Sequence, residues 1–191
     1  NDDGSTVTWT CDDLKTAGVK LDSTTKVVVT YKATLNEKAV IGSAGNPNTV
    51  NLTYSNNPNK GGEGETGKTP DDKNIVFTYK AVVNKVDQDK KSLAGAGFTL
   101  QKKVNGAYTD VKSFTAGEAT TFTFTGLDDG TYVLRETKTP DGYNSIEDQT
   151  FTISAEHDEN SDDPKLTALT GDVASGSIID LGVMLENGEL S

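Results

Sequence analysis

Short runs of β-branched and aromatic residues, separated by turn-forming residues, dominate this sequence of 191 residues. Apolar and polar residues alternate within the runs, and this period of two predicts strands with one buried face. Threonine is frequent, which suits strands and disfavours helices. Only residues 12–17 offer a helical turn. The predicted strands cover residues 26–35, 49–54, 75–86, 98–101, 120–124, 131–134 and 150–153. The sequence therefore predicts an all-β protein built from antiparallel sandwiches.

A stretch rich in Gly, Asn, Pro and charged residues, over residues 55–73, separates two groups of predicted strands. We interpret it as a long hairpin loop, because the predicted strand after it is long enough to finish one domain and begin the next. The predicted fold is two tandem Ig-like β-sandwich domains, over residues 1–79 and 80–191. Residues 1–79 are few for a sandwich, so we expect the first domain to be truncated at its N-terminus.

The composition argues against several classes of partner. The net charge of −11 and the pI near 4.5 would repel both nucleic acid and anionic lipid. No apolar run approaches the length of a membrane helix. The sequence has one cysteine, Cys11, and one histidine, His157, so it predicts neither an intrachain disulfide nor a thiol-based active site. We predict no cofactor.

Two motifs match functional patterns only superficially. Residues 62–69 fit the phosphate-loop pattern G-x-x-x-x-G-K-[ST], but Pro70 and a predicted strand follow where a helix is needed, and two glutamates would repel phosphate. We therefore expect residues 61–72 to form an exposed, mobile loop that binds no nucleotide. The acidic run over residues 157–163 lacks the spacing of a calcium loop, so we interpret it as a solvated turn.

Three motifs in the second half of the chain are more specific. They are N-K-V-D at residues 84–87, L-A-G-A-G-F-T-L at residues 93–100 and G-T-Y-V-L-R-E-T-K-T-P-D-G-Y at residues 130–143. In this order and spacing they resemble the Cna-B type domain of Gram-positive pilins and adhesins. Residues 31–36, 45–48 and 54–58 are similar to the domain that precedes Cna-B in backbone pilins. The family's Pro-Lys polymerisation motif and LPxTG sorting signal do not occur here, so we expect the sequence to be part of a longer protein.

The resemblance implies an intramolecular Lys–Asn isopeptide bond, assisted by a buried acid. Strand parity places Glu136 on one face with Tyr132 and Leu134, and Lys85 on one face with Val83, so both polar side chains point inward. Burial disfavours the charged forms of amines and carboxyls alike. A neutral Lys85 amine would then attack an Asn carbonyl that protonated Glu136 polarises, once per molecule and without an enzymatic cycle. The runner-up amines are Lys80 and Lys90.

The Asn acceptor has two possible positions. Asn187 shares its parity with Val183 and Leu185, which would aim it inward. Alternatively, Asn187 and Gly188 form a two-residue hairpin turn, the last strand begins at Glu189, and the acceptor lies beyond this sequence.

The first domain offers its own candidate acceptor. Leu52, Tyr54 and Asn56 alternate onto one face, which makes Asn56 the best candidate there. Its Lys and acid partners would lie upstream of residue 1.

The resemblance implies a structural shaft subunit of a cell-wall-anchored, extracellular pilus. Its partners would be neighbouring pilin subunits and a sortase, with a host surface ligand as a further possibility. One alternative is a non-polymerised surface adhesin that binds collagen or glycan and carries Cna-B stalk domains. A second is an extracellular hydrolase, which the lack of a recognisable carboxylate pair disfavours.

Overall fold

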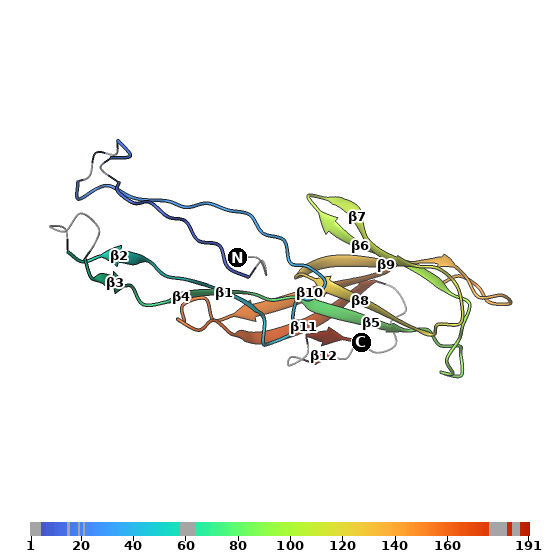
Figure 1. Ribbon diagram of the computed structural model, residues 1–191. Helices are drawn as coiled ribbons and strands as arrows, with labels where there is room; N and C mark the ends of the chain where they lie inside the picture. The colour runs from blue at the N-terminus through green and yellow to red at the C-terminus, as the bar shows by residue number, and fades with distance from the viewer. Residues whose placement is uncertain are drawn as a thin grey trace. The chain divides into compact units, whose positions relative to one another are not determined.

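The computed structural model contains strands and no helix among the residues that it describes, and hence no helix able to cross a membrane (Figure 1). The described residues are 5–14, 16–18, 20, 22–57, 64–175, 183–184 and 188–191. The chain divides into two compact units, Asn1–Thr34 with Val50–Asp71 and Leu35–Thr49 with Asp72–Ser191. The all-β prediction is confirmed.

The larger unit is a β-sandwich of two sheets. One sheet has five strands in the order β11-β10-β9-β6-β7, and the other has four in the order β12-β13-β5-β8. The strands are β5 Tyr79–Asn84, β6 Gly97–Val104, β7 Ala107–Phe114, β8 Thr121–Leu127, β9 Gly130–Lys138, β10 Gln149–His157, β11 Leu166–Ser175, β12 Val183–Met184 and β13 Glu189–Leu190. Neighbouring strands run antiparallel, except that β13 runs parallel to β5.

The hydrophobic core lies between these two sheets. Alternate residues of β5, β8 and β13 meet alternate residues of β6, β9, β10 and β11, as the period of two requires. Aromatic rings form its centre, with Phe98 and Phe122 edge to face at 4.9 Å between ring centroids. The buried core residues are Tyr79, Ala81, Ala96, Phe98, Leu100, Phe122, Phe124, Leu127, Tyr132, Leu134, Phe151, Ile153, Leu166, Leu169 and Leu190.

The chain before the sandwich differs from the prediction. The predicted strand over residues 75–86 is two strands, β4 (Asp72–Val76) and β5, separated by Phe77 and Thr78. Strand β4 pairs with β1 (Asn46–Val50) in a separate two-stranded sheet.

In the smaller unit, β2 (Thr53–Ser55) and β3 (Thr66–Lys68) form an antiparallel hairpin, as expected for residues 55–73. The expectation of a loop throughout residues 61–72 is wrong, because Thr66–Lys68 is paired as a strand.

The strand predicted over residues 26–35 is absent. That stretch has no regular secondary structure, and Val27 and Val28 are exposed. Among the described residues, this segment has no neighbouring strand with which it could pair, and an unpaired strand is not stable alone. The expected helical turn is a single one, in which the amide of Ala17 donates to the carbonyl of Asp13. None of the described residues of the smaller unit belongs to the buried core, so the tandem-sandwich arrangement stays a prediction.

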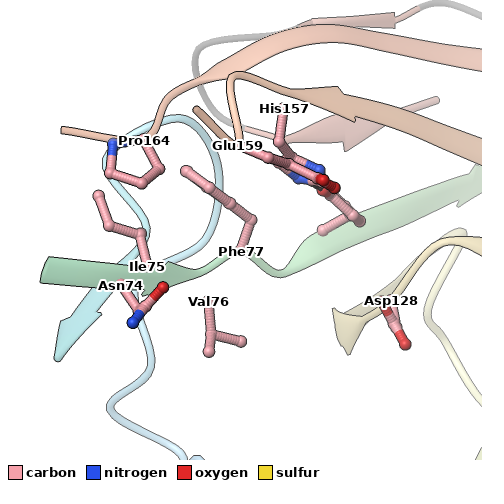
Figure 2. Close-up of a pocket in the computed structure, with 9 residues that line it drawn as sticks. Asn74, Ile75, Val76, Phe77, Asp128, His157, Glu159 and Pro164 are labelled. Atoms are coloured by element: carbon pink, nitrogen blue, oxygen red, sulfur yellow. Dashed lines mark hydrogen bonds between the residues drawn. The ribbon is translucent and has the colours of Figure 1, made fainter. Parts of the chain in front are cut away.

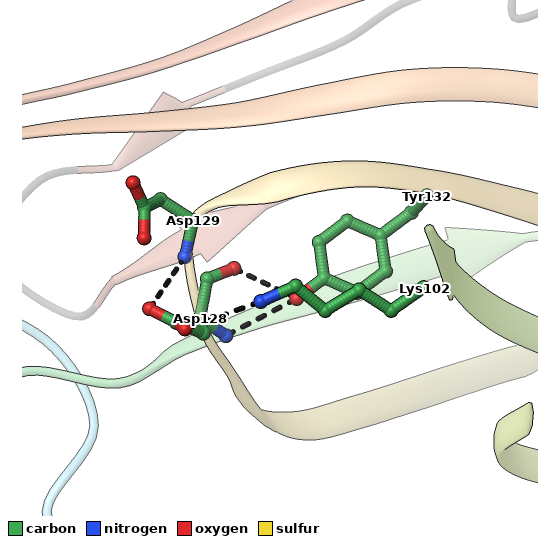
Figure 3. A network of polar contacts seen from close by, with 4 residues as sticks. All are labelled: Lys102, Asp128, Asp129 and Tyr132. Atoms are coloured by element: carbon green, nitrogen blue, oxygen red, sulfur yellow. Dashed lines mark hydrogen bonds and ion pairs between the residues drawn. The ribbon is translucent and has the colours of Figure 1, made fainter. Parts of the chain in front are cut away.

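The turn between β8 and β9 holds a polar network (Figure 3). The Tyr132 hydroxyl donates to the carbonyl of Asp128 at 2.7 Å and accepts from the Asp128 amide at 3.2 Å. The Lys102 ammonium lies 3.1 Å from the Asp128 carboxylate. Burial, with a smaller contribution from the charges of Asp128 and Asp129, raises the pKa of Tyr132 to about 12. The same causes raise the pKa of Tyr79 to about 12.

The two tyrosines predict a loss of stability at alkaline pH. An unfolded tyrosine ionises near pH 10, whereas the folded Tyr79 and Tyr132 keep their protons up to about pH 12. The free energy of unfolding should therefore be fully present below about pH 10 and fall as the pH rises toward about 12. In urea denaturation between about pH 10 and 12, the free energy of unfolding of Tyr132→Phe should fall less steeply with pH than that of the wild type. The exposed Tyr108 is the control, and an equal flattening in Tyr108→Phe would contradict the assignment.

The burial of the aromatic residues predicts how much each contributes to the stability of the sandwich. Phe124 is fully buried on β8, so Phe124→Ala should lower the free energy of unfolding by about 3–5 kcal/mol. Tyr108 is 40% exposed on the edge strand β7, so Tyr108→Ala should cost about 1 kcal/mol or less. Chemical denaturation of both variants measures the difference. Similar losses would show that the core does not lie where the structure has it.

Candidate functional site

A lysine and a glutamate meet between the two sheets of the sandwich. Lys85 follows β5 in one sheet, and Glu136 belongs to β9 in the other. Lys85 Nζ lies 3.0 Å from Glu136 Oε1, and the side chains are 10% and 0% exposed. The sequence analysis predicted that both would point inward, and the structure brings them together.

Strand parity and local backbone hydrogen bonds produce this arrangement. On β9, Tyr132 and Leu134 are buried on the core face, and Glu136 follows them two residues later. The backbone of Lys85 is held on both sides, since its amide donates to the carbonyl of Thr120 at 2.8 Å and its carbonyl accepts from the amide of Leu93 at 2.9 Å. The pair thus lies at the end of the core, on fixed backbone.

The two carboxyl oxygens of Glu136 have different surroundings. Oε2 accepts hydrogen bonds from the Thr139 hydroxyl at 3.3 Å and from the Ile146 amide at 3.1 Å. Oε1 is buried and, within the described part of the chain, accepts no hydrogen bond. The Lys85 ammonium is close to Oε1 but outside the angular range of a hydrogen bond. A buried polar atom without such a partner is costly and calls for an explanation. The sequence analysis missed Thr139 and Ile146, because loop contacts carry no periodic signal.

The structure describes the strands on both sides of the predicted acceptor, Asn187. Asn187 itself lies outside the described residues. Strands β12 and β13 pair antiparallel, with Val183 opposite Leu190 and Met184 opposite Glu189, and β13 begins at Glu189. Leu190 pairs in parallel with Ala81. Ala81 lies four residues before Lys85 in the sequence.

The remaining predicted residues lie elsewhere. Asn56 is exposed just after β2, and its backbone N–H donates to the carbonyl of Glu65. Lys80 pairs with Glu189 at 2.8 Å, and Lys90 is exposed. The phosphate-loop match is not followed by a helix, since Lys68 ends β3 and strand β4 comes next. Lys68 instead forms an exposed ion pair with Asp71 at 3.0 Å.

Apart from this site, a pocket with a volume of about 480 Å³ lies between β4 and the end of β10 (Figure 2). His157 lines it, stacks on Phe77 with 4.9 Å between ring centroids, and has Nε2 3.0 Å from the Tyr79 hydroxyl. The histidine therefore packs the end of the sandwich. Within the described ranges, no three His, Cys, Asp or Glu side chains are placed to hold a metal ion.

Comparison with known proteins identifies the sandwich. Residues 80–166 match the family of SpaA prealbumin-like fold domains. The chain is 36% identical, over 140 residues, to the trypsin-resistant surface T6 protein of Streptococcus pyogenes serotype M6. That match covers 66% of this chain and 25% of the T6 protein, so the chain spans about a quarter of its relative's length.

Two solved structures are similar as well. The T6 backbone pilin of serotype M6 Streptococcus pyogenes, which has a modular three-domain structure, matches 82% of this chain and 43% of its own with a TM-score of 0.52 and 24% identity. The pilus 2b backbone protein of group B streptococcus matches 47% of this chain and 39% of its own, with a TM-score of 0.39 and 27% identity. The Lys85–Glu136 pair thus lies within the segment that matches SpaA prealbumin-like fold domains, and the chain is similar to the T6 surface protein of Streptococcus pyogenes.

Proposed function

We propose that this chain is part of a shaft subunit of a cell-wall-anchored pilus, and that its sandwich is locked by an isopeptide bond from Lys85. The observation that carries the proposal is the buried Lys85–Glu136 pair in a domain related to those of backbone pilins. The homologous backbone pilins are structural proteins rather than enzymes. Neighbouring subunits and a sortase are the partners, and the protein acts outside the cell.

The geometry supports bond formation in a few steps. Nζ of Lys85 and Oε1 of Glu136 are 3.0 Å apart, so a small change in the angle between the two groups would let one ammonium proton pass to the carboxylate. A neutral amine and a neutral acid result. The amine then attacks the acceptor carbonyl of an Asn, while the acid polarises that carbonyl. The new bond joins Nζ to the Asn Cγ, the Cγ–Nδ2 bond breaks, and the nitrogen leaves as ammonia.

The register of β13 supports an acceptor on the last strand. Adjacent strands are about 4.8 Å apart, within reach of a lysine side chain. Leu190 is buried beside Ala81, and a residue four positions further along β13 would lie on the same face and level with Lys85. This supports the alternative in which the acceptor follows residue 191 over the alternative of Asn187.

Such a bond would matter because it joins the first and last strands of the sandwich. Strands β5 and β13 are adjacent and parallel, so a load that pulls on both shears their short ladder. A covalent link between them would carry the load instead. By closing a loop of about 100 residues it would also stabilise the fold by about 5 kcal/mol, according to the chain-entropy account of cross-links.

The bond predicts a mass deficit. The full-length protein should weigh less than its sequence by one ammonia for the Lys85 bond, and the peptide that contains Lys85 should be branched in a tryptic digest. Glu136→Ala should remove that branch and lower the thermal unfolding midpoint, because the acid promotes the reaction. If the present 191 residues alone show the deficit, Asn187 is the acceptor.

An unbranched Lys85 peptide in the full-length protein would overturn the proposed bond. Lys138→Ala is the matched control, because Lys138 pairs with Asp141 at the exposed surface and should leave the branch intact.

The buried pair also predicts a stability pattern that does not depend on the bond. Lys85→Met leaves the carboxyl of Glu136 buried without its cation, which typically costs about 3–5 kcal/mol. Adding Glu136→Gln removes the buried charge, so the double variant should be more stable than Lys85→Met alone. Neither variant can form the bond, and urea denaturation compares them directly. A double variant less stable than the single one would contradict the burial of this pair.

A further inference from the structure

The loop after β9 closes over Glu136. We call residues 139–146 the strap. A turn in its middle is fixed by a hydrogen bond from the Tyr143 amide to the Pro140 carbonyl at 3.2 Å, with Gly142 at φ +84°. Pro140 is buried at one end, and the Ile146 side chain packs against the core at the other. Both ends of the strap are therefore anchored independently of Glu136.

Both hydrogen bonds from the strap go to the same carboxyl oxygen. The Thr139 hydroxyl and the Ile146 amide donate to Oε2, at 3.3 Å and 3.1 Å. An oxygen that accepts two hydrogen bonds is a poor place for a proton, since the proton would meet two donors. Oε1 accepts none within the described residues and has Lys85 Nζ 3.0 Å away. The strap thus distinguishes two oxygens that are chemically equivalent in a free carboxylate.

We propose that the strap, through the Thr139 hydroxyl, reserves Oε2 as an acceptor and so places the proton of Glu136 on Oε1. Thr139 is then a positioning residue for bond formation, and this inference rests on the proposed function. The proton balance is simple: Lys85 gives one ammonium proton to Oε1, and the pair becomes a neutral amine and a neutral acid. The acid then carries its O–H on the oxygen that faces the reacting amine. A proton on Oε2 would point into the strap and polarise nothing.

The rate of bond formation tests this role. The full-length protein is synthesised in vitro, and the fraction of branched Lys85 peptide is followed with time by mass spectrometry. Thr139→Val keeps the shape of the side chain and removes its hydroxyl, so the branch should form about tenfold more slowly, the loss typical of one hydrogen bond to a charged group. Thr139→Ser restores the hydroxyl and should recover the rate to within about twofold of the wild type.

Thr137 supplies the matched control. It lies two residues before Thr139, near the end of β9, is exposed, and has no described hydrogen bond to Glu136. Thr137→Val should leave the rate unchanged. A loss of rate in Thr137→Val equal to that in Thr139→Val would assign the effect to the strand as a whole and overturn the inference.

A spectroscopic measurement separates positioning from simple packing. The carbonyl stretch of protonated Glu136 is identified with ¹³C-labelled glutamate as the band that Glu136→Gln lacks. Thr139→Val should move it to higher wavenumber, because Oε2 loses one donor, and Thr139→Ser should move it back. An unmoved band in a folded Thr139→Val protein would overturn the inference, even if the rate falls.

Two different outcomes would overturn the proposed function and the proposed role of Thr139. A wild-type protein without any branched Lys85 peptide would overturn the proposed function and this inference with it. A wild type that forms the branch, together with a Thr139→Val variant that forms it equally fast, would overturn the inference and leave the proposed function standing.

Discussion

The ion pair between Lys85 and Glu136 is the costliest interaction to bury in the sandwich, because two charges lose their contact with water. The lysine is 10% exposed and the glutamate side chain is fully buried. Replacing such a pair with apolar residues of similar volume is often neutral or even stabilising. Packing alone therefore gives no reason for these two residues at the end of an aromatic core. The proposed bond formation would give such a reason, because a condensation needs an amine beside an acid, and these two groups lie 3.0 Å apart.

The sequence allowed much of the sandwich to be predicted wherever one strand face is buried. The alternation in β9 predicted the inward direction of Glu136 correctly, because Tyr132 and Leu134 mark the core face. Strand β7 was missed, since nearly all its residues are exposed and it shows no alternation. A signal for it does exist: Asn105 and Gly106, with φ of 50° and 86°, form the two-residue turn that joins β6 to β7.

The failures in the smaller unit and in the strap have different physical causes. The run over residues 26–35 has strand-like alternation but no partner strand among the described residues, and alternation alone does not supply hydrogen bonds. The strap brings Ile146 to Glu136 across ten residues, which depends on the turn at Pro140–Tyr143 and not on any period. Local pattern thus predicted the direction of the acid, whereas loop geometry decided which of its oxygens is free.

Lys80 and Lys85 lie five residues apart but have different surroundings. Lys80 lies between Tyr79 and Ala81, which are both buried in the core, so strand parity turns Lys80 away from the core. Its ammonium pairs with Glu189 at 2.8 Å, where both side chains remain partly exposed to water. Lys85 lies an odd number of residues further on, faces inward, and meets a carboxyl whose other oxygen is already held. The parity of the two positions therefore separates a partly exposed ion pair at Lys80 from a buried one at Lys85.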